Sequence, residues 1–261
     1  WLLSAEQQKS PHFSSRPEQA DIRLLVIHNI SLPPGQFGGT YITDFFLGKL
    51  AVDAHPYFAE IAELRVSAHC LITRAGHIVQ YVSFNDMAWH AGVSKWECDN
   101  DINDRSIGIE IVNTGHSYPG YVSEYKPFPE AQMEALITLS KGIVERHDIE
   151  PWHVIGHSDV AWRRKIDPGE LFDWKRLSDA GIGCWPQRNF QQEYLQLDVS
   201  VNADKFIANL KRYGYDTEIR EDDIATLISA FQRHFRQNNI DGILDSETMW
   251  CLDSILKQKF N

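Results

Sequence analysis

The chain contains little cysteine and no long apolar run. Only four of its 261 residues are cysteine (Cys70, Cys98, Cys184 and Cys251), and none of them forms a CxxC pair. They are too few for a disulfide scaffold and badly spaced for a structural zinc site. We expect four separate thiols, with a Cys184–Cys251 disulfide as the alternative in an oxidising compartment. No segment approaches the roughly 18 consecutive apolar residues of a membrane-spanning helix, so no membrane span is expected.

Positive charge is also scarce. The 25 Lys and Arg residues stand against 36 Asp and Glu residues, which gives a net charge of −11 at pH 7. Because binding to nucleic acid needs a basic surface, we expect no nucleic-acid partner. The hydrophobic fraction of 43% excludes a disordered chain. The chain begins at Trp1 and not at Met, so we expect that processing or truncation removed its start, together with any signal peptide or lipid anchor.

Strand and helix patterns mix in the first 190 residues. Apolar runs predict strands at 22–28, 106–112 and 153–157, and a β-hairpin is predicted from 65–73 and 77–83, joined at Ala75-Gly76. Apolar residues at three- and four-residue steps predict a helix from Pro129 to His147, and another helix is expected to begin near Glu170. This mixture predicts an α/β fold with a mixed central β-sheet flanked by helices.

The pattern changes after Trp185-Pro186. Residues 187–201 are polar and connective, and three helical segments follow at about 202–213, 221–236 and 245–258. Asn202, Asp222 and Asp245 are the expected helix caps. We therefore predict two domains, 1–190 and 191–261, the second a small three-helix domain.

Two histidines and one aspartate are candidate metal ligands. His28 ends an apolar strand, and His157 and Asp167 frame the dense polar segment 156–169. Two nitrogens and one carboxylate oxygen form the ligand set of a catalytic zinc with an open fourth position. Taken alone this trio is only one of many pairings of distant histidines, and a histidine at the end of a strand is often a hydrogen-bonded core residue.

A carboxylate and a lysine accompany this trio. Glu110 lies in the apolar strand 106–112, on the face opposite to its isoleucines. A buried carboxylate needs a partner or a cation, and the alternative is that Glu110 faces solvent. Lys165 precedes Asp167 by two residues, so an extended segment places both on one side.

Five motifs together resemble one enzyme family. They are VIHN (26–29), SAHCLI (67–72), WHAG (89–92), SIGIEI (106–111) and GHSD with RKIDPG (156–169). In this order they resemble the zinc-dependent N-acetylmuramoyl-L-alanine amidases, which share a fold with the peptidoglycan recognition proteins. The resemblance covers residues 1 to about 186. A non-catalytic peptidoglycan-binding or sensing protein on the same fold is the alternative, and it is less favoured because no ligand position is lost.

Two branches of this family are visible in the chain. Residues 10–98 resemble the cytoplasmic AmpD enzymes that recycle anhydromuropeptides, and residues 106–186 resemble the envelope amidase AmiD. The C-terminal helices resemble the peptidoglycan-binding module of the second branch. The resemblance implies a peptidoglycan or anhydromuropeptide substrate. We expect a monomer in the periplasm or envelope of a Gram-negative bacterium, with the cytoplasm as the alternative.

The resemblance also implies the role of each site residue. His28, His157 and Asp167 would bind Zn²⁺, Glu110 would act as general base and then acid, and Lys165 would stabilise the oxyanion. The reaction would cut the amide between the lactyl group of N-acetylmuramic acid and L-alanine. The residues expected to line the substrate groove are Asn29, Arg65, Trp89 and His90. The alternative for Arg65 is a solvated surface residue, and for the other three it is a structural role.

Overall fold

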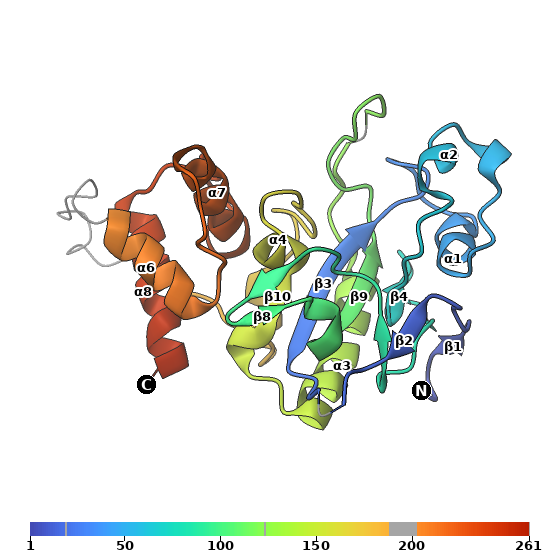
Figure 1. Cartoon of the computed structure of the whole chain (residues 1–261), viewed down its shortest axis with the longest axis horizontal. Coiled ribbons are helices and arrows are strands. Elements are labelled where there is room, and N and C mark those ends of the chain that lie inside the picture. The colour runs from blue at the N-terminus through green and yellow to red at the C-terminus, as the bar shows by residue number, and fades with distance from the viewer. Residues whose placement is uncertain (19, 123, 188–202, 261) are drawn as a thin grey trace.

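The centre of the molecule is a six-stranded sheet with the order β1-β5-β4-β9-β3-β10 (Figure 1). The computed structural model describes residues 1–18, 20–122, 124–187 and 203–260. The strands are β1 (Glu6–Gln7), β3 (Leu24–Ile30), β4 (Cys70–Ile72), β5 (Ile78–Gln80), β9 (Ser106–Val112) and β10 (Val154–Gly156). All neighbours pair in parallel except β4 and β5, which form the predicted hairpin. The mixed sheet with flanking helices confirms the predicted fold class.

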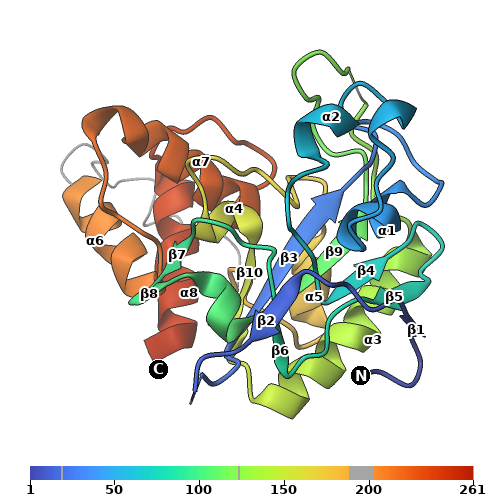
Figure 2. The same ribbon diagram turned by 45° about the vertical axis from the view of Figure 1, so that its right-hand side comes forward.

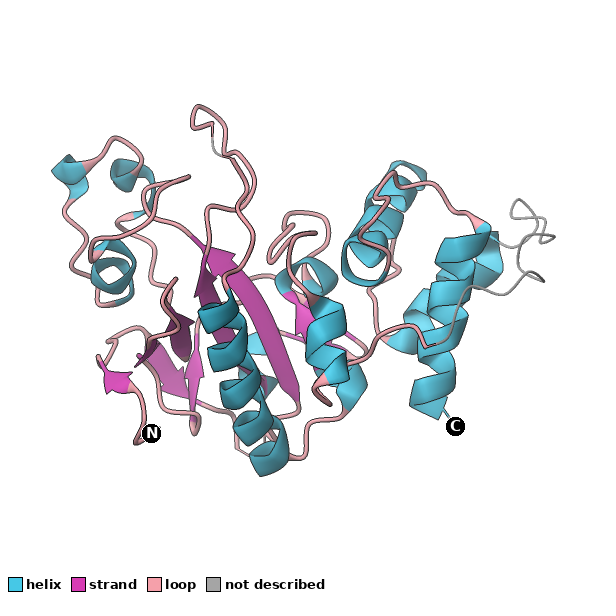
Figure 3. Cartoon of the chain, turned by 180° about the vertical axis from the view of Figure 1, so that it is seen from behind, coloured by secondary structure: helices cyan, strands magenta, loops and turns pink. Residues whose placement is uncertain are grey.

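One face of the central strands is covered by the long helix α3 (Glu130–His147), seen from behind in Figure 3. The residues that form this buried core, none more than 2% exposed, are Leu25, Ile27, Ile107, Ile109, Ile111, Met133, Leu136 and Ile143. The alternation predicted for strand 106–112 is therefore correct. The next helix, α5 (Trp174–Asp179), begins later than expected, because the side chain of Asp173 accepts the Arg176 N–H at 2.9 Å and caps it there.

Smaller elements cover the β4–β5 end of the sheet and its edges (Figure 2). The helical ones are α1 (Tyr41–Phe46), η1 (Val52–Ala54), α2 (Phe58–Ile61), η2 (Ile102–Arg105) and η3 (Pro151–His153). Two short antiparallel pairs join β2 (Phe13–Ser15) to β6 (Asp86–Ala88) and β7 (Lys95–Trp96) to β8 (Asp99–Asn100). Phe45, Phe46 and Phe58 pack with Leu71 and Val79 in a separate buried cluster.

The C-terminal helices share a core with the other face of the sheet. They are α6 (Ala203–Tyr213), the 3-10 turn η6 (Glu221–Asp223), α7 (Ile224–Phe235) and α8 (Ser246–Phe260), and we call them together the C-terminal module. Leu24, Val26 and Ile155 of the sheet belong to the same buried cluster as Phe206 and Phe231 of the module. The module is thus packed onto the sheet. The predicted domain boundary near residue 190 and the predicted cap Asn202 lie outside the described residues.

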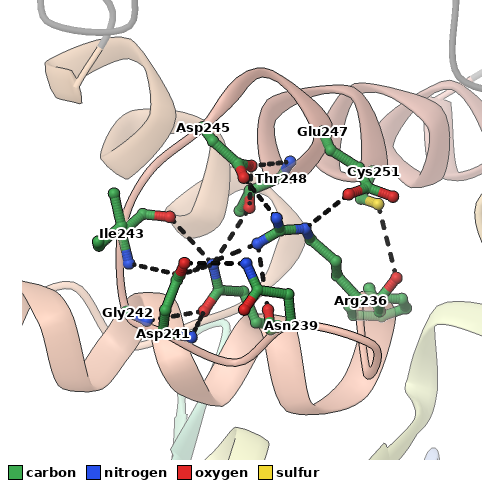
Figure 4. A network of polar contacts seen from close by, with 11 residues as sticks. Arg236, Asn239, Asp241, Gly242, Ile243, Asp245, Glu247, Thr248 and Cys251 are labelled. Atoms are coloured by element: carbon green, nitrogen blue, oxygen red, sulfur yellow. Dashed lines mark hydrogen bonds and ion pairs between the residues drawn. The ribbon is translucent and has the colours of Figure 1, made fainter.

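The turn between α7 and α8 is held by a polar network (Figure 4). Arg236 is 6% exposed and forms ion pairs with Asp245 and with Glu247, the latter at 2.9 Å. Asp245 also accepts the Thr248 N–H at 2.8 Å, which confirms it as the predicted cap of α8. At the start of α7 the cap position belongs to Asp223 and not to Asp222, because η6 extends the turn by one residue.

The four thiols are unpaired, so Cys184 and Cys251 form no disulfide, and only Cys98 is exposed. Within the described ranges, no helix combines the length and the apolar character needed to cross a membrane.

Candidate active site

The predicted metal ligands meet at the carboxyl edge of the sheet. His28 lies in β3, and its parallel neighbour β10 runs directly into the short helix α4 (His157–Val160), which begins with His157. Asp167 lies on the loop that follows α4. In open sheets the ends of adjacent parallel strands are the usual place for a site, because side chains from several elements converge there.

The geometry of the trio suits a metal ion. Nδ1 of His28 lies 2.9 Å from Nδ1 of His157, and Oδ2 of Asp167 lies 3.3 Å and 3.1 Å from these two atoms. A tetrahedral zinc with ligand bonds of about 2.0–2.1 Å separates its ligand atoms by about 3.3 Å. In the described part of the chain, these three residues form the group that could hold a metal. The structure therefore contains a potential His-His-Asp metal site at the predicted residues.

Each histidine is oriented through its second ring nitrogen. Nε2 of His157 lies 3.1 Å from the carbonyl oxygen of Ala91, and Nε2 of His28 lies 2.9 Å from Nδ1 of His90. His90 in turn contacts the Ser106 hydroxyl through its own Nε2, at 3.0 Å. Such hydrogen bonds leave Nδ1 free for a metal and fix the ring. His90, which the sequence assigned to the substrate groove, thus lies against His28.

Gly108 makes this arrangement of rings sterically feasible. A methyl group at Gly108 would overlap the ring of His90, which lies directly over strand β9. A glycine inside a strand often marks such a close approach. Gly108 was not among the residues predicted for the site, although a single glycine in the apolar run 106–112 is the signal that could have pointed to it.

The protonation states fit metal binding. Burial, together with the neighbouring His157, lowers the pKa of His28 to about 4. Burial alone would raise the pKa of Asp167, but the charge and hydrogen bonds of His157 and His28 hold it well below its usual range. At neutral pH the site therefore offers a neutral imidazole at His28 and a carboxylate, which are the forms that bind metals.

Glu110 lies beside the trio and outside it. It is the register partner of His28 on β9, and its Oε1 lies 4.0 Å from Nδ1 of His28. Its side chain is 13% exposed, and its Oε2 is buried with no hydrogen-bond partner among the described residues. Burial, reinforced by the charge of Asp167, raises the pKa of Glu110 well above its usual value. Glu110 is therefore placed to exchange a proton with a molecule bound at the trio.

Lys165 supplies positive charge at the same place. Its side chain is half-buried, and its charge lowers the pKa of both His28 and Glu110. Within the described residues its ammonium group has no ion pair. It is therefore available to a negative charge that develops in the site.

The other candidate residues occupy different environments. Asn29 donates from Nδ2 to the carbonyl oxygen of Pro168 at 2.8 Å, and so supports the loop that carries Asp167. The indole of Trp89 is half-buried and donates to the Ser14 hydroxyl at 3.0 Å. Arg65 is exposed. The assignment of these three residues to substrate binding stays a prediction.

The chain is similar to known proteins over much of its length. The profile of the N-acetylmuramoyl-L-alanine amidase family matches residues 18–170. The 1,6-anhydro-N-acetylmuramyl-L-alanine amidase AmpD of Haemophilus influenzae is 51% identical over 176 residues, which are 67% of this chain and 91% of that protein. The N-acetylmuramoyl-L-alanine amidase AmiD of Escherichia coli is 34% identical over 249 residues, which are 91% of this chain and 83% of that protein.

A solved structure extends the comparison to the whole fold. The crystal structure of AmpDh3 from Pseudomonas aeruginosa in complex with anhydromuramic pentapeptide has a TM-score of 0.75 and 31% sequence identity, and the match covers 94% of this chain and 96% of that one. The similarity to AmpD thus spans about two thirds of the chain, whereas the similarities to AmiD and AmpDh3 cover more than nine tenths of it.

Proposed function

Because this chain belongs to the N-acetylmuramoyl-L-alanine amidase family and is an enzyme of the AmpD/AmiD type, we propose that its His28, His157 and Asp167 hold a zinc ion. The observation that carries the proposal is the convergence of their three ligand atoms within 2.9–3.3 Å of one another. Two imidazoles and one carboxylate, with an open fourth position, are typical of catalytic zinc. A zinc ion bound there supplies Lewis-acid chemistry, which makes a water easier to deprotonate and polarises a carbonyl oxygen.

Two residues beside the trio transfer the proton and stabilise the negative charge during the reaction. The carboxylate of Glu110, whose Oε1 lies 4.0 Å from Nδ1 of His28, takes the proton from the attacking water and then delivers it to the amine that leaves. The ammonium of Lys165 stabilises the negative charge that develops on the scissile carbonyl oxygen. The bond that breaks joins the lactyl group of N-acetylmuramic acid to L-alanine, and the products are a sugar carboxylate and a free stem peptide.

The substrate we propose is an anhydromuropeptide or the corresponding unit of a peptidoglycan strand. The similarity to AmpDh3, whose structure holds an anhydromuramic pentapeptide, supports the first of these. We assign Asn29, Arg65 and Trp89 to the substrate side of the site, whereas His90, predicted to line the same groove, contacts Nε2 of His28 and orients that ring from behind.

A polymeric substrate would also involve the C-terminal module. A cavity of about 480 Å³ lies between the module and the end of the amidase part, and Trp185 and Trp250 are among its lining residues. Tryptophan rings present flat apolar faces, which suit the apolar faces of sugar rings. Since the similarity to AmiD covers 91% of this chain, module included, we propose the periplasm or envelope as the compartment. Recovery of the enzyme in the cytoplasmic fraction of its source cells would reject this location.

The zinc proposal is tested by removing the metal. A chelator should stop release of the stem peptide from anhydromuropeptide, and added zinc should restore it, as followed by chromatography of the products. Asp167→Ala should purify with little zinc while keeping its helix content. Undiminished cleavage by metal-free enzyme, or full zinc content in Asp167→Ala, would show that the ligand set is wrong.

The substrate preference is tested in parallel. Whole sacculi and isolated anhydromuropeptide are digested by the parent and by Trp250→Ala, and the released stem peptide is quantified. If the module contacts polymer, Trp250→Ala slows release from sacculi and leaves the rate on the small substrate unchanged. Equal rates for parent and variant on both substrates would reject the role of this cavity.

A further inference from the structure

Asp159 is a buried carboxylate beside the metal site for which the reaction itself has no use. It is the third residue of α4, whose first residue is His157, and its exposure is 0%. Its Oδ2 accepts the Gly156 N–H at 2.7 Å and lies 2.7 Å from Nδ1 of His234, while its Oδ1 accepts the Tyr215 hydroxyl at 2.6 Å. A carboxylate without water is stable only when it is paired and hydrogen-bonded, and these contacts satisfy that need.

Two of the three partners come from the C-terminal module. Tyr215 follows α6 and His234 lies in α7, and each is 2% exposed. The ring of His234 is stacked between Trp174 and Phe235, with centroid distances of 3.8 Å to both. Because these rings are fixed by packing, they hold Asp159 in one position.

The same short helix carries one proposed ligand, His157, and is hydrogen-bonded to another, Asp167. The Ser158 N–H, in α4, donates to the carbonyl oxygen of Asp167 at 2.9 Å, so the helix is tied directly to the loop residue that is the third proposed ligand. The Ala161 N–H donates to the carbonyl oxygen of His157 at 3.0 Å. A displacement of α4 would therefore move two of the three proposed ligands together.

We propose that Asp159 is a positioning residue for the metal site, and that the C-terminal module, through Tyr215 and His234, sets how tightly the site holds zinc. The proposal rests on the zinc ligands proposed above. Groups behind the ligands of a metal fix their orientation, and their loss typically weakens metal binding by about 10- to 100-fold. Here part of that supporting layer is contributed by Tyr215 and His234, which lie more than fifty residues further along the chain.

Tyr215→Phe isolates this effect, because it removes one hydroxyl and keeps the ring. Tyr213→Phe is the matched control, since Tyr213 is 1% exposed in the same buried cluster and forms no hydrogen bond to Asp159 among the described residues. The zinc dissociation constant is measured on the full chain at pH 7 by competition with a chromophoric chelator, with zinc alone as the probe, and folding is followed by circular dichroism.

We expect the dissociation constant to rise about tenfold in Tyr215→Phe and to change less than about twofold in Tyr213→Phe. At saturating zinc, kcat of Tyr215→Phe should recover while KM stays close to that of the parent. Equal zinc affinity in the parent and Tyr215→Phe would overturn the proposal, and so would an equal loss in both tyrosine variants.

A second pair of variants serves if Tyr215→Phe does not fold. In His234→Asn the side-chain amide can still donate to Asp159, whereas in His234→Phe no donor remains. Weaker zinc binding in His234→Phe than in His234→Asn supports the proposal, and equal binding overturns it. If the proposed zinc ligands are themselves wrong, the parent and Asp167→Ala will bind zinc equally. That result is distinct from the results that would overturn the role of Asp159.

Discussion

The two faces of the β3–β9 strand pair differ in chemistry although they are built from alternate residues of the same strands. Toward α3, Ile107, Ile109 and Ile111 are fully buried among other apolar side chains. On the opposite face Gly108 and Glu110 alternate with them, and Glu110 lies next to His28. The first face is apolar throughout, whereas the second carries, beside the buried Leu24 and Val26, groups that require partners or a cation. Substitutions on the two faces should therefore affect different measurements.

Glu110→Gln should give the largest effect. It keeps the shape of the side chain but removes the proton acceptor, so kcat should fall by about 100-fold or more, the scale of general base catalysis. Zinc content and the free energy of unfolding should stay close to those of the parent. Stem-peptide release and metal analysis measure both quantities, and a rate within a factor of a few of the parent would remove Glu110 from the mechanism.

Ile109→Ala, one residue before Glu110 and on the other face, should lower the stability and leave the catalytic rate of the folded enzyme unchanged. Deleting most of a buried isoleucine costs about 2–5 kcal/mol of unfolding free energy, because a cavity remains. The folded fraction should retain kcat and its metal. Urea denaturation and activity per folded enzyme provide the test, and the separation of the two faces would be disproved by a large loss of kcat at unchanged stability.

Gly108→Ala should affect both the stability and the metal site, each less strongly than the two substitutions above. The added methyl group overlaps the ring of His90, so we expect a loss of about 1–3 kcal/mol in stability together with weaker zinc binding through His28. Gly142→Ala, in the exposed part of α3, is the control. Apart from its chain neighbours and the backbone of its own helix, no atom lies within 4 Å of the added methyl group, and alanine should stabilise this helix by up to about 1 kcal/mol.

The smallest expected effect concerns how α3 and α8, which lie on opposite sides of the sheet, are attached to the rest of the molecule. α3 packs on the sheet through apolar side chains and through Gln132, whose side-chain amide donates to the carbonyl oxygens of Ile72 and Val112. α8 has a partly buried ionic attachment, in which Glu97 pairs with Lys259 and lies 3.2 Å from Nε2 of His153. Burial alone would raise the pKa of Glu97, but hydrogen bonds from His153 and Lys259 lower it to about 2.

Since the pKa of Glu97 is lower in the folded state, its stabilisation is complete above the unfolded value near 4.5 and is lost as the pH falls toward 2. Glu97→Gln should therefore lower the unfolding free energy at pH 7 by about 1 kcal/mol and flatten its decline in acid. Chemical denaturation between pH 7 and pH 2 checks this, with the exposed Glu63→Gln as control. Parallel pH curves for the parent and Glu97→Gln would refute the ionic attachment.

The sequence was informative where a periodic pattern or a motif was local. The strand 106–112, the α3 helix and the hairpin follow from residue spacing, and the ligand trio follows from the motifs that resemble the amidase family. The contacts behind the ligands could not be predicted in this way. They join residues distant in the chain, as Asp159 with His234 or His28 with His90, and depend on how the module and the loops pack.

The pairing of β3 with β9 has a consequence for variation in chain length. The two strands pair residue by residue from Leu24 with Ser106 to Ile30 with Val112. Because side chains alternate between faces, an insertion or deletion of one residue inside either strand would turn its site residue into the apolar core. Length changes that keep His28 and Glu110 in the site are therefore expected in the loops beyond the ends of these two strands, and not inside the strands.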